Sequence, residues 1–170
     1  MRNISVFQQL FYSGPPFETL YRDYALQHHI DKQAAVQAVD DILINAPTHK
    51  VWEVLADVNS WASSNPIFSN VRFQSEIAVG AKGSFRLNGF PIKATFAVVD
   101  PGHELSWVGE ALWTKAIDRL VLEPTLDGST RLRLEESLAG VLVPLMSSSA
   151  RLHKQHQMSL GNFKAAAEAA

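Results

Sequence analysis

The stretch from Leu145 to Ala170 reads LMSSSARLHKQHQMSLGNFKAAAEAA, and its spacing decides the fold. Apolar or small residues, with one histidine among them, return at steps of three and four, which places them on one face of an α-helix. That face consists of Leu145, Ser149, Leu152, His156, Leu160, Phe163 and Ala167. Pro144 is tolerated in a first helical turn, because no intrahelical N–H bond is lost there. We therefore predict one long helix that starts beside Pro144.

Ser149 and His156 interrupt the apolar stripe of this predicted helix. A helix of about 25 residues is roughly 37 Å long, so its apolar face needs a broad partner. A stripe with two polar interruptions is thin for a closed core. We predict that one side of the helix covers a cavity, into which these two side chains point.

The preceding sequence predicts mainly β-strands, because apolar residues there recur with period two. The expected strands cover residues 36–44, 71–75, 84–87, 92–99, 104–113, 116–123 and 130–138. Asn88-Gly89 and Asp127-Gly128 are typical of tight hairpins, whose strands are antiparallel. Val51, Trp52, Leu55 and Val58 predict a helix after Pro47, and a turn or second short helix follows around Trp61.

These elements predict an α+β helix-grip arrangement. A curved antiparallel sheet of about six to seven strands wraps around the long C-terminal helix, and two short helices follow the first strand. Because one helix cannot fill a strongly bent sheet, a pocket is expected between them. Residues 36–170 would form this ligand-binding domain. Residues 1–35 would form an N-terminal arm with a short helix, since Ser13-Gly14-Pro15-Pro16 breaks the chain before a helical pattern begins at Phe17.

The composition of the 170 residues is that of a globular domain, with a net charge of −2 and no cysteine. No basic block is present, so we expect no nucleic-acid partner. The absence of cysteine fits a reducing compartment, and the N-terminal residues lack the apolar run of a secretory signal. No apolar run approaches the ~20 residues of a membrane span. We therefore expect a cytoplasmic protein without a membrane span.

Several short motifs occur in an order that resembles a known superfamily. They are Asn45-Ala46-Pro47 with Val51-Trp52, Asp57 with Trp61, Asn65-Pro66, Asp100-Pro101-Gly102 before Leu105 and Trp107, Leu122-Glu123-Pro124 before Asp127-Gly128 and Thr130, Glu136 with Gly140, and Phe163-Lys164. Together they resemble the START/polyketide-cyclase (SRPBCC) helix-grip superfamily. This resemblance implies a hydrophobic cavity between the sheet and the C-terminal helix, used for lipids, polyketides or other apolar molecules. Members have many different roles, so the fold does not select a function.

Asp118 and Glu136 form the best candidate for chemistry. A hairpin centred on Asp127-Gly128 places the two carboxyl groups opposite or diagonal to each other, on a face that is otherwise apolar. Burial and mutual repulsion would raise at least one pKa, as a general acid or base requires. The superfamily often has His where Asp118 stands, so no family role is carried over to it. The alternative is that both carboxylates pair at the sheet end with Arg119, Arg131 or Arg133.

His156 is the third predicted catalytic residue, because it lies on the apolar face of the helix. His153 lies one turn earlier and can approach it. A His-x-x-His pair without a further ligand is a poor zinc signal, so we predict no metal site. No nucleotide-binding, nucleophile-elbow or zinc-protease motif occurs, and we predict no cofactor.

The predicted ligand contacts are Arg86, Phe96, Trp107, Leu120, Met146 and Ser149. Arg86 would either point inward, to bind a carboxylate or phenolate, or lie exposed while Phe85 and Leu87 are buried. Three functions stay open. The first is binding of a hydrophobic small molecule, polyketide-like, aromatic or lipid. The second is a cyclase, aromatase-like enzyme, dehydratase or isomerase that uses acid–base residues in the same cavity. The third is an interaction or stress-associated domain whose arm forms a homodimer.

Overall fold

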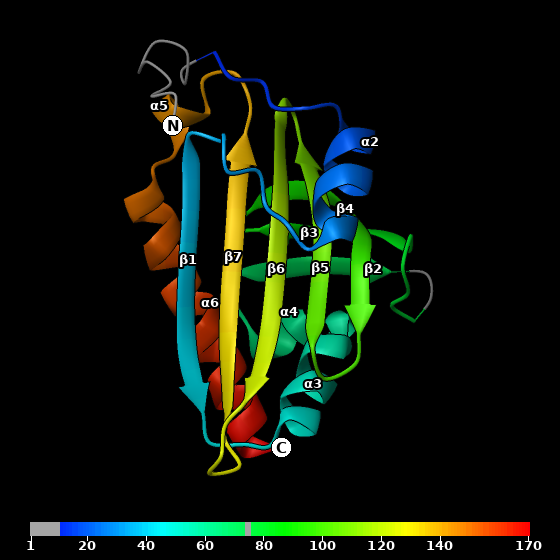
Figure 1. Cartoon of the computed structure of the whole chain (residues 1–170), viewed down its shortest axis with the longest axis vertical. Helices are drawn as coiled ribbons and strands as arrows, with labels where there is room; N and C mark the ends of the chain where they lie inside the picture. Colours follow the sequence, from blue (N-terminus) through cyan, green and yellow to red (C-terminus); the bar gives the residue numbers. More distant parts are fainter. Residues whose placement is uncertain (1–10, 74–75) are drawn as a thin grey trace.

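The computed structural model describes residues 11–73 and 76–170. Within these residues seven strands form one antiparallel sheet, in the spatial order β1-β7-β6-β5-β4-β3-β2 (Figure 1). Their bounds are β1 (Val36–Ile44), β2 (Phe68–Phe73), β3 (Lys82–Leu87), β4 (Phe90–Asp100), β5 (Glu104–Ala111), β6 (Thr114–Pro124) and β7 (Thr130–Ala139). Asn88 and Gly89 both have positive φ angles, of 48° and 87°, as a two-residue hairpin turn requires.

The helices lie before β1, between β1 and β2, and after β7. They are α2 (Phe17–Thr19), η1 (Leu20–Tyr24), η2 (Ala25–Gln27), α3 (Thr48–Ala56), η3 (Val58–Ser60), α4 (Trp61–Ser64), α5 (Val143–Met146) and α6 (Ser149–Ala169). The predicted α+β helix-grip fold is confirmed, with its curved sheet, its two short helices after the first strand and its long C-terminal helix.

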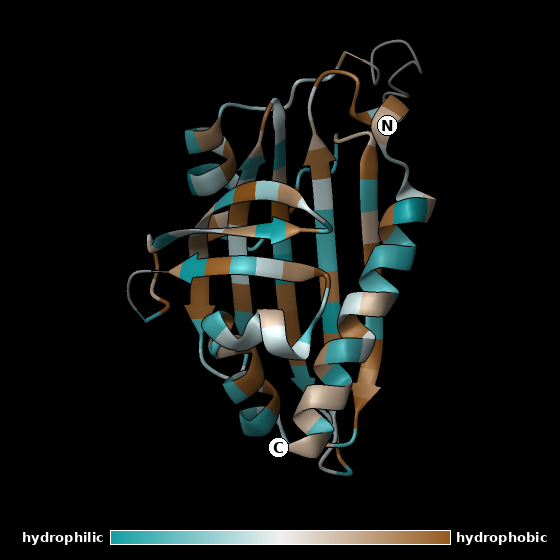
Figure 2. Cartoon of the chain, turned by 180° about the vertical axis from the view of Figure 1, so that it is seen from behind, coloured by the Kyte–Doolittle hydropathy of each residue, from teal (hydrophilic) through white to brown (hydrophobic). Residues whose placement is uncertain are grey.

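The sheet bends strongly along its length. In Figure 1 the strands β1, β7, β6 and β5 run along the long axis, and Figure 2 shows β2 and β3 crossing in front of them when the molecule is seen from behind. Irregular pairing between Phe96 and Val98 in β4, and between Ser69 and Arg72 in β2, accompanies this bend. A bulge increases local twist and bends a strand. The sheet therefore has a concave face, and α6 lies across it.

The predicted start of the long helix was wrong. The helix α6 begins at Ser149, and Ser148 caps it by accepting a hydrogen bond from the backbone N–H of Arg151 at 3.2 Å. Ser147 and Ser148 have extended backbones, and Leu145, on the separate turn α5, is 71% exposed. Serine is strongly preferred at an N-cap, which here outweighs the continuing apolar spacing.

Side chains of α6 also satisfy the free edge of β1. The Nζ atom of Lys164 donates to the carbonyl of Leu43 at 2.7 Å, and Glu168 accepts from the N–H of Asn45 at 2.7 Å. Unpaired groups on an edge strand otherwise invite pairing with another chain. The helix therefore both closes the concave face and covers the outer edge of the sheet.

Several strand boundaries also differ from the predicted ones, including those of β5 and β2. The strand β5 ends at Ala111 rather than at residue 113, because Leu112 and Trp113 form the turn to β6 and Leu112 has a φ of 52°. The strand predicted over residues 71–75 begins earlier, as β2 at Phe68. Residues 74–75 of that prediction, and residues 1–10 of the predicted arm, lie outside the described residues.

The described part of the arm packs on the convex face of the sheet. Leu20, Ala25 and Ile30 are buried there against Ala97 and Val108. Figure 1 shows α2 and the turns after it in front of β4 and β5. The arm thus buries its apolar side chains on its own sheet, and its role in a homodimer stays a prediction.

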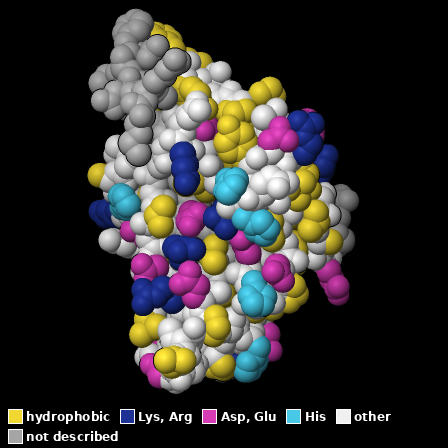
Figure 3. All heavy atoms as spheres, viewed as in Figure 1, with side chains coloured by type: hydrophobic (Ala, Val, Ile, Leu, Met, Phe, Trp, Pro, Cys, Tyr) yellow, Lys and Arg dark blue, Asp and Glu magenta, His cyan; other side chains and the backbone are white. Residues whose placement is uncertain are grey.

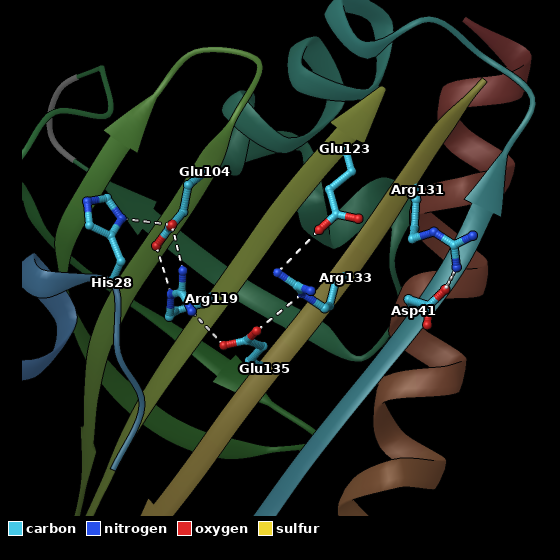
Figure 4. A network of polar contacts seen from close by, with 8 residues as sticks. All are labelled: His28, Asp41, Glu104, Arg119, Glu123, Arg131, Arg133 and Glu135. Carbon is cyan, nitrogen blue, oxygen red and sulfur yellow. Dashed lines mark hydrogen bonds and ion pairs between the residues drawn. The ribbon is translucent and has the colours of Figure 1, made fainter. Parts of the chain in front are cut away.

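Charged side chains of both signs alternate over the rest of the convex face (Figure 3). The guanidinium of Arg119 binds Glu104 through two hydrogen bonds of 2.8 and 2.9 Å and also contacts Glu135 (Figure 4). His28, from the arm, lies 2.9 Å from the same Glu104 carboxylate. This network therefore fastens the arm to strands β5, β6 and β7 on the side opposite to α6.

Candidate functional site

The space between the concave face and α6 holds a cavity in two adjacent parts. The inner part has a volume of about 80 Å³, and its walls are largely aromatic and aliphatic. These walls include Phe68, Phe85, Trp107, Leu120, Leu134 and Phe163. The polar groups that line it include Asp118, Glu136 and His156. An apolar cavity with a few converging polar groups is the usual form of a small-molecule site.

The outer part of the cavity forms a wider vestibule of about 440 Å³. It shares Leu87, Glu136 and Leu138 with the inner part, so the two are adjacent. The apolar side chains on its rim are exposed: Phe90, Leu112, Trp113, Met146 and Met158. The vestibule therefore offers an apolar molecule an exposed apolar surface next to the inner cavity.

Strand pairing brings Asp118 and Glu136 together. In the register of β6 and β7 the two residues are direct partners, and both side chains are buried. Side chains on a strand alternate between faces, so Arg119 and Glu135 point to the convex side and pair there instead. The arginines considered as partners for the two carboxyl groups, Arg119, Arg131 and Arg133, all bind other acids, as Figure 4 shows.

His156 joins the carboxyl pair to a third acid. Its Nε2 atom lies 3.0 Å from Oε2 of Glu136, and its Nδ1 atom lies 2.9 Å from Oδ2 of Asp40. The Nδ1 atom of His153 lies 2.8 Å from that same oxygen of Asp40. The side chains become more exposed along this row, from 2% for His156 to 16% for Asp40 and 44% for His153.

Burial sets the protonation of these groups. It raises the pKa of Asp118 well above the usual range, and the neighbouring Glu136 raises it further. Burial also raises the pKa of Glu136 to about 7, against the opposing effect of its hydrogen bond from Asp118. The pKa of His156 is lowered by burial, although the charges of Asp118 and Asp40 partly restore it. The pair therefore keeps a proton to higher pH than ordinary carboxyl groups do, which places an acid beside a base.

Three of the six predicted ligand contacts line the cavity. Trp107 and Leu120 form part of the inner wall, and Met146 lies in the vestibule.

The other three predicted contacts do not reach the cavity. Phe96 is buried in the core between the rings of Phe73 and Trp107, at centroid distances of 5.0 and 6.2 Å. The Oγ atom of Ser149 accepts from the N–H of Gln37 at the edge of β1. Arg86 lies exposed, as strand alternation beside the buried Phe85 requires, and donates to the carbonyl of Gly89.

Asp40 is the main site residue that sequence reasoning missed. On β1 it occupies the face whose other members are Val36, Ala38, Ile42 and Ile44. An acid at an inward position of an apolar strand was the signal available. Gln155 and Ser159 were missed too, and both line the inner cavity from α6.

The described ranges, 11–73 and 76–170, contain no group of three or more metal-binding side chains arranged to hold a metal ion. In the same ranges no helix has the length and apolar character to cross a membrane.

Solved structures of similar shape share the fold. A hypothetical protein of Helicobacter pylori is 16% identical, with a TM-score of 0.72, and the match covers 97% of this chain and 98% of that one. The Zhui aromatase/cyclase from Streptomyces sp. R1128 is 18% identical, with a TM-score of 0.65 and coverages of 82% and 94%. The di-domain aromatase/cyclase StfQ from the steffimycin biosynthetic pathway is 14% identical, with a TM-score of 0.65 and coverages of 79% and 51%.

Among curated protein sequences no match was found. A family model described as "Polyketide cyclase / dehydrase and lipid transport" matches residues 35–168, which hold the whole sheet, the cavity and nearly all of α6. The chain therefore belongs to the polyketide cyclase/dehydrase and lipid transport family.

Proposed function

We propose that this protein binds an apolar small molecule in the cavity and catalyses dehydration or ring closure at a carbonyl group beside Asp118 and Glu136. One observation carries the proposal: two buried carboxyl groups that are direct partners on neighbouring strands, one of them in contact with His156, line a largely apolar cavity. A simple binding site would be easier to build without buried carboxyl groups, since unpaired burial of such groups is costly. The family and its aromatase/cyclase neighbours support this choice.

The proposed dehydration needs only proton transfers from the protein. In a dehydration, the carboxylate of Glu136 takes a proton from the carbon next to the carbonyl group, and protonated Asp118 gives a proton to the departing hydroxyl. Water leaves and a carbon–carbon double bond forms, so no oxidant or reductant is needed. Loss of the proton from Glu136 and uptake of one proton by Asp118 then restore the starting state. Proton transfer by one placed group typically accelerates a reaction by about 10²–10⁴-fold.

The first test asks whether the cavity binds apolar molecules. An apolar fluorescent dye, anilinonaphthalene sulfonate, serves as the probe. Ala116→Phe places a ring in the inner cavity, which Ala116 lines, whereas Ala165→Phe places the same ring on an exposed position of α6. We expect dye binding to be lost in the first variant and kept in the second. Equal binding by the two variants would place the apolar site elsewhere.

The second test asks whether the carboxyl pair is reactive. A β-hydroxy ketone with a phenyl ring serves as substrate, because its dehydration gives a conjugated enone that is followed by ultraviolet absorbance. We expect Asp118→Asn and Glu136→Gln to keep dye binding and to lose turnover by about 10²-fold or more. Dye binding without turnover by the unmodified protein, on this substrate and on a poly-β-ketone, would instead support a carrier of apolar molecules.

A further inference from the structure

A row of hydrogen bonds extends from Glu136 toward β1, through His156 to Asp40 and His153. We propose that Asp40 is a positioning residue for the acid–base site. It holds His156 in the tautomer whose unprotonated Nε2 faces Glu136. Asp40 and His153 also form a proton path from the carboxyl pair to solvent. This inference rests on the proposed function, because it assigns the supply of protons to the same site. Its residues lie on β1 and on α6, outside the carboxyl pair itself.

The geometry at Asp40 fixes the hydrogen atoms. A carboxylate only accepts hydrogen bonds, and two imidazoles turn their Nδ1 atoms to the same Oδ2, at 2.8 and 2.9 Å. Each Nδ1 therefore carries a hydrogen. In neutral His156 this leaves Nε2 without one, and its lone pair points at Oε2 of Glu136, 3.0 Å away.

The contact between His156 and Glu136 then has two states that differ by the place of one proton. With the proton on oxygen, both groups are neutral. With the proton on Nε2, Glu136 is a carboxylate beside an imidazolium. The negative charge of Asp40 stabilises the second state, in which Glu136 is the base that the chemistry requires. In the opposite tautomer Nε2 would already carry a hydrogen and could not accept the proton of Glu136.

The side chain of His153, at the outer end of this row of hydrogen bonds, is exposed to solvent. A proton that leaves Glu136 moves to Nε2 of His156, the proton on Nδ1 passes to Asp40, and Asp40 releases it to His153 or to solvent. Only N–H and O–H bonds form and break. The titratable groups that face His156 come from three strands, namely Asp40, Glu136 and Asp118, and His153 faces Asp40 from α6 itself.

This path is separate from the route for the ligand. The vestibule is lined from α6 by Arg151, Lys154, Gln155 and Met158, whereas neither His153 nor Asp40 lines the vestibule or the inner cavity. Protons can therefore reach the site while a ligand fills the vestibule. A site that opened only through the vestibule would lose contact with water at that moment.

The test uses nuclear magnetic resonance of the full chain with ¹⁵N-labelled histidine and without any ligand. Asp40→Asn is compared with Asp41→Asn, since Asp41 is the next residue on the same strand but points to the convex side and pairs with Arg131. We expect the unmodified protein and Asp41→Asn to show His156 protonated on Nδ1 in its neutral form. In Asp40→Asn this tautomer should be lost and His156 should titrate at lower pH. Asp40→Glu should restore the original tautomer.

The path itself is tested with His153→Leu, which covers Asp40 with an apolar group. We expect the ring N–H of His156 to lose its rapid exchange with water. Unchanged exchange in this variant would overturn the path, and an unchanged tautomer in Asp40→Asn would overturn the positioning role. Neither readout needs a substrate, so a failure of this inference can be distinguished from a failure of the proposed reaction. If the phenyl β-hydroxy ketone is dehydrated, Asp40→Asn should also lower turnover about 10–100-fold, as is typical for partners behind a reacting group.

Discussion

Glu136 and His156 join the middle of the sheet to the C-terminal helix through a contact of 3.0 Å, although their exposed fractions are only 6% and 2%. Neither side chain would be buried in this way without the other element, because α6 is the cover of the concave face. The pKa shifts of the carboxyl pair, on which the proposed reaction rests, therefore depend on the docking of α6. Stability and reactivity should respond together to pH.

Replacement of Glu136 by Gln should change how stability depends on pH. The pKa of Glu136 is about 7 in the folded protein and 4.5 in its unperturbed state, so the folded chain binds more protons between these values. The free energy of unfolding contributed by this group is thus complete below about pH 4.5 and is lost as the pH rises through 7, by about 3 kcal/mol at most. The lowered pKa of His156 acts in the opposite direction below its usual value of 6.5.

Urea unfolding at pH 5 and at pH 8 measures this effect. Glu136→Gln keeps His156, so the difference between the variant and the unmodified protein reports the titration of Glu136 together with its effect on the pKa of Asp118. We expect the variant to gain stability relative to the unmodified protein as the pH rises. The same pH slope in both proteins would contradict the raised pKa.

Replacement of Arg119 by Ala should destabilise the fold strongly. Arg119 is only 11% exposed and neutralises Glu104 and Glu135, which are 8% and 16% exposed. Loss of one partner from a buried ion pair leaves an uncompensated charge and typically costs about 3–5 kcal/mol. Arg131→Ala is the matched control, because its pair with Asp41 is about half exposed and such pairs contribute about 0–1 kcal/mol. Similar losses in urea unfolding for the two variants would be inconsistent with this difference in burial.

Replacement of Leu20 by Ala should weaken the fold and spare the cavity. Leu20 is buried on the convex face against Ala97, Val108 and Ile117. A buried Leu→Ala change typically costs about 2–5 kcal/mol. Because the cavity lies on the other face, the affinity for anilinonaphthalene sulfonate should not change under conditions where the variant is folded. A weaker affinity in the folded variant would show that the arm acts on the cavity.

Replacement of Leu112 by Gly should stabilise the protein and reduce binding. Leu112 is 78% exposed and has a φ of 52°, in the left-handed region that costs a bulky side chain about 1 kcal/mol. Glycine adopts this backbone without that cost. Leu112 also lies on the rim of the vestibule, so the variant should bind the dye less well. Thermal unfolding and dye titration measure the two effects, and a loss of stability would show that the leucine makes contacts that outweigh the strain.

Local sequence patterns were enough to place most strands and the carboxyl pair. The strand from Val36 to Ile44 was predicted with the bounds that the structure has, because its alternation is regular. The Asp127-Gly128 turn set the register of β6 and β7, and this register makes Asp118 the partner of Glu136. Both results follow from the period of two and from turn chemistry, which act over a few residues.

Features that depend on packing could not be predicted in the same way. The irregular pairing after Phe96 breaks the alternation of β4, so the sequence does not show which way that ring points. The contact of Asp40 with His156 requires knowledge of how α6 crosses β1, which no local pattern contains. The same crossing decides that Ser149 binds the edge of β1 instead of a ligand.

The pairing of β1 with β7 has a consequence for the newly made chain. Val36 pairs with Leu138 and Ile44 with Thr130, so the first strand leaves the ribosome long before its partner exists. Contacts between distant residues make folding slow and expose unpaired strands on the way. Asp40 lies on this early strand, and His156 is synthesised later still, on α6. The contacts of His156 with Asp40 and Glu136 therefore cannot form until α6 has left the ribosome.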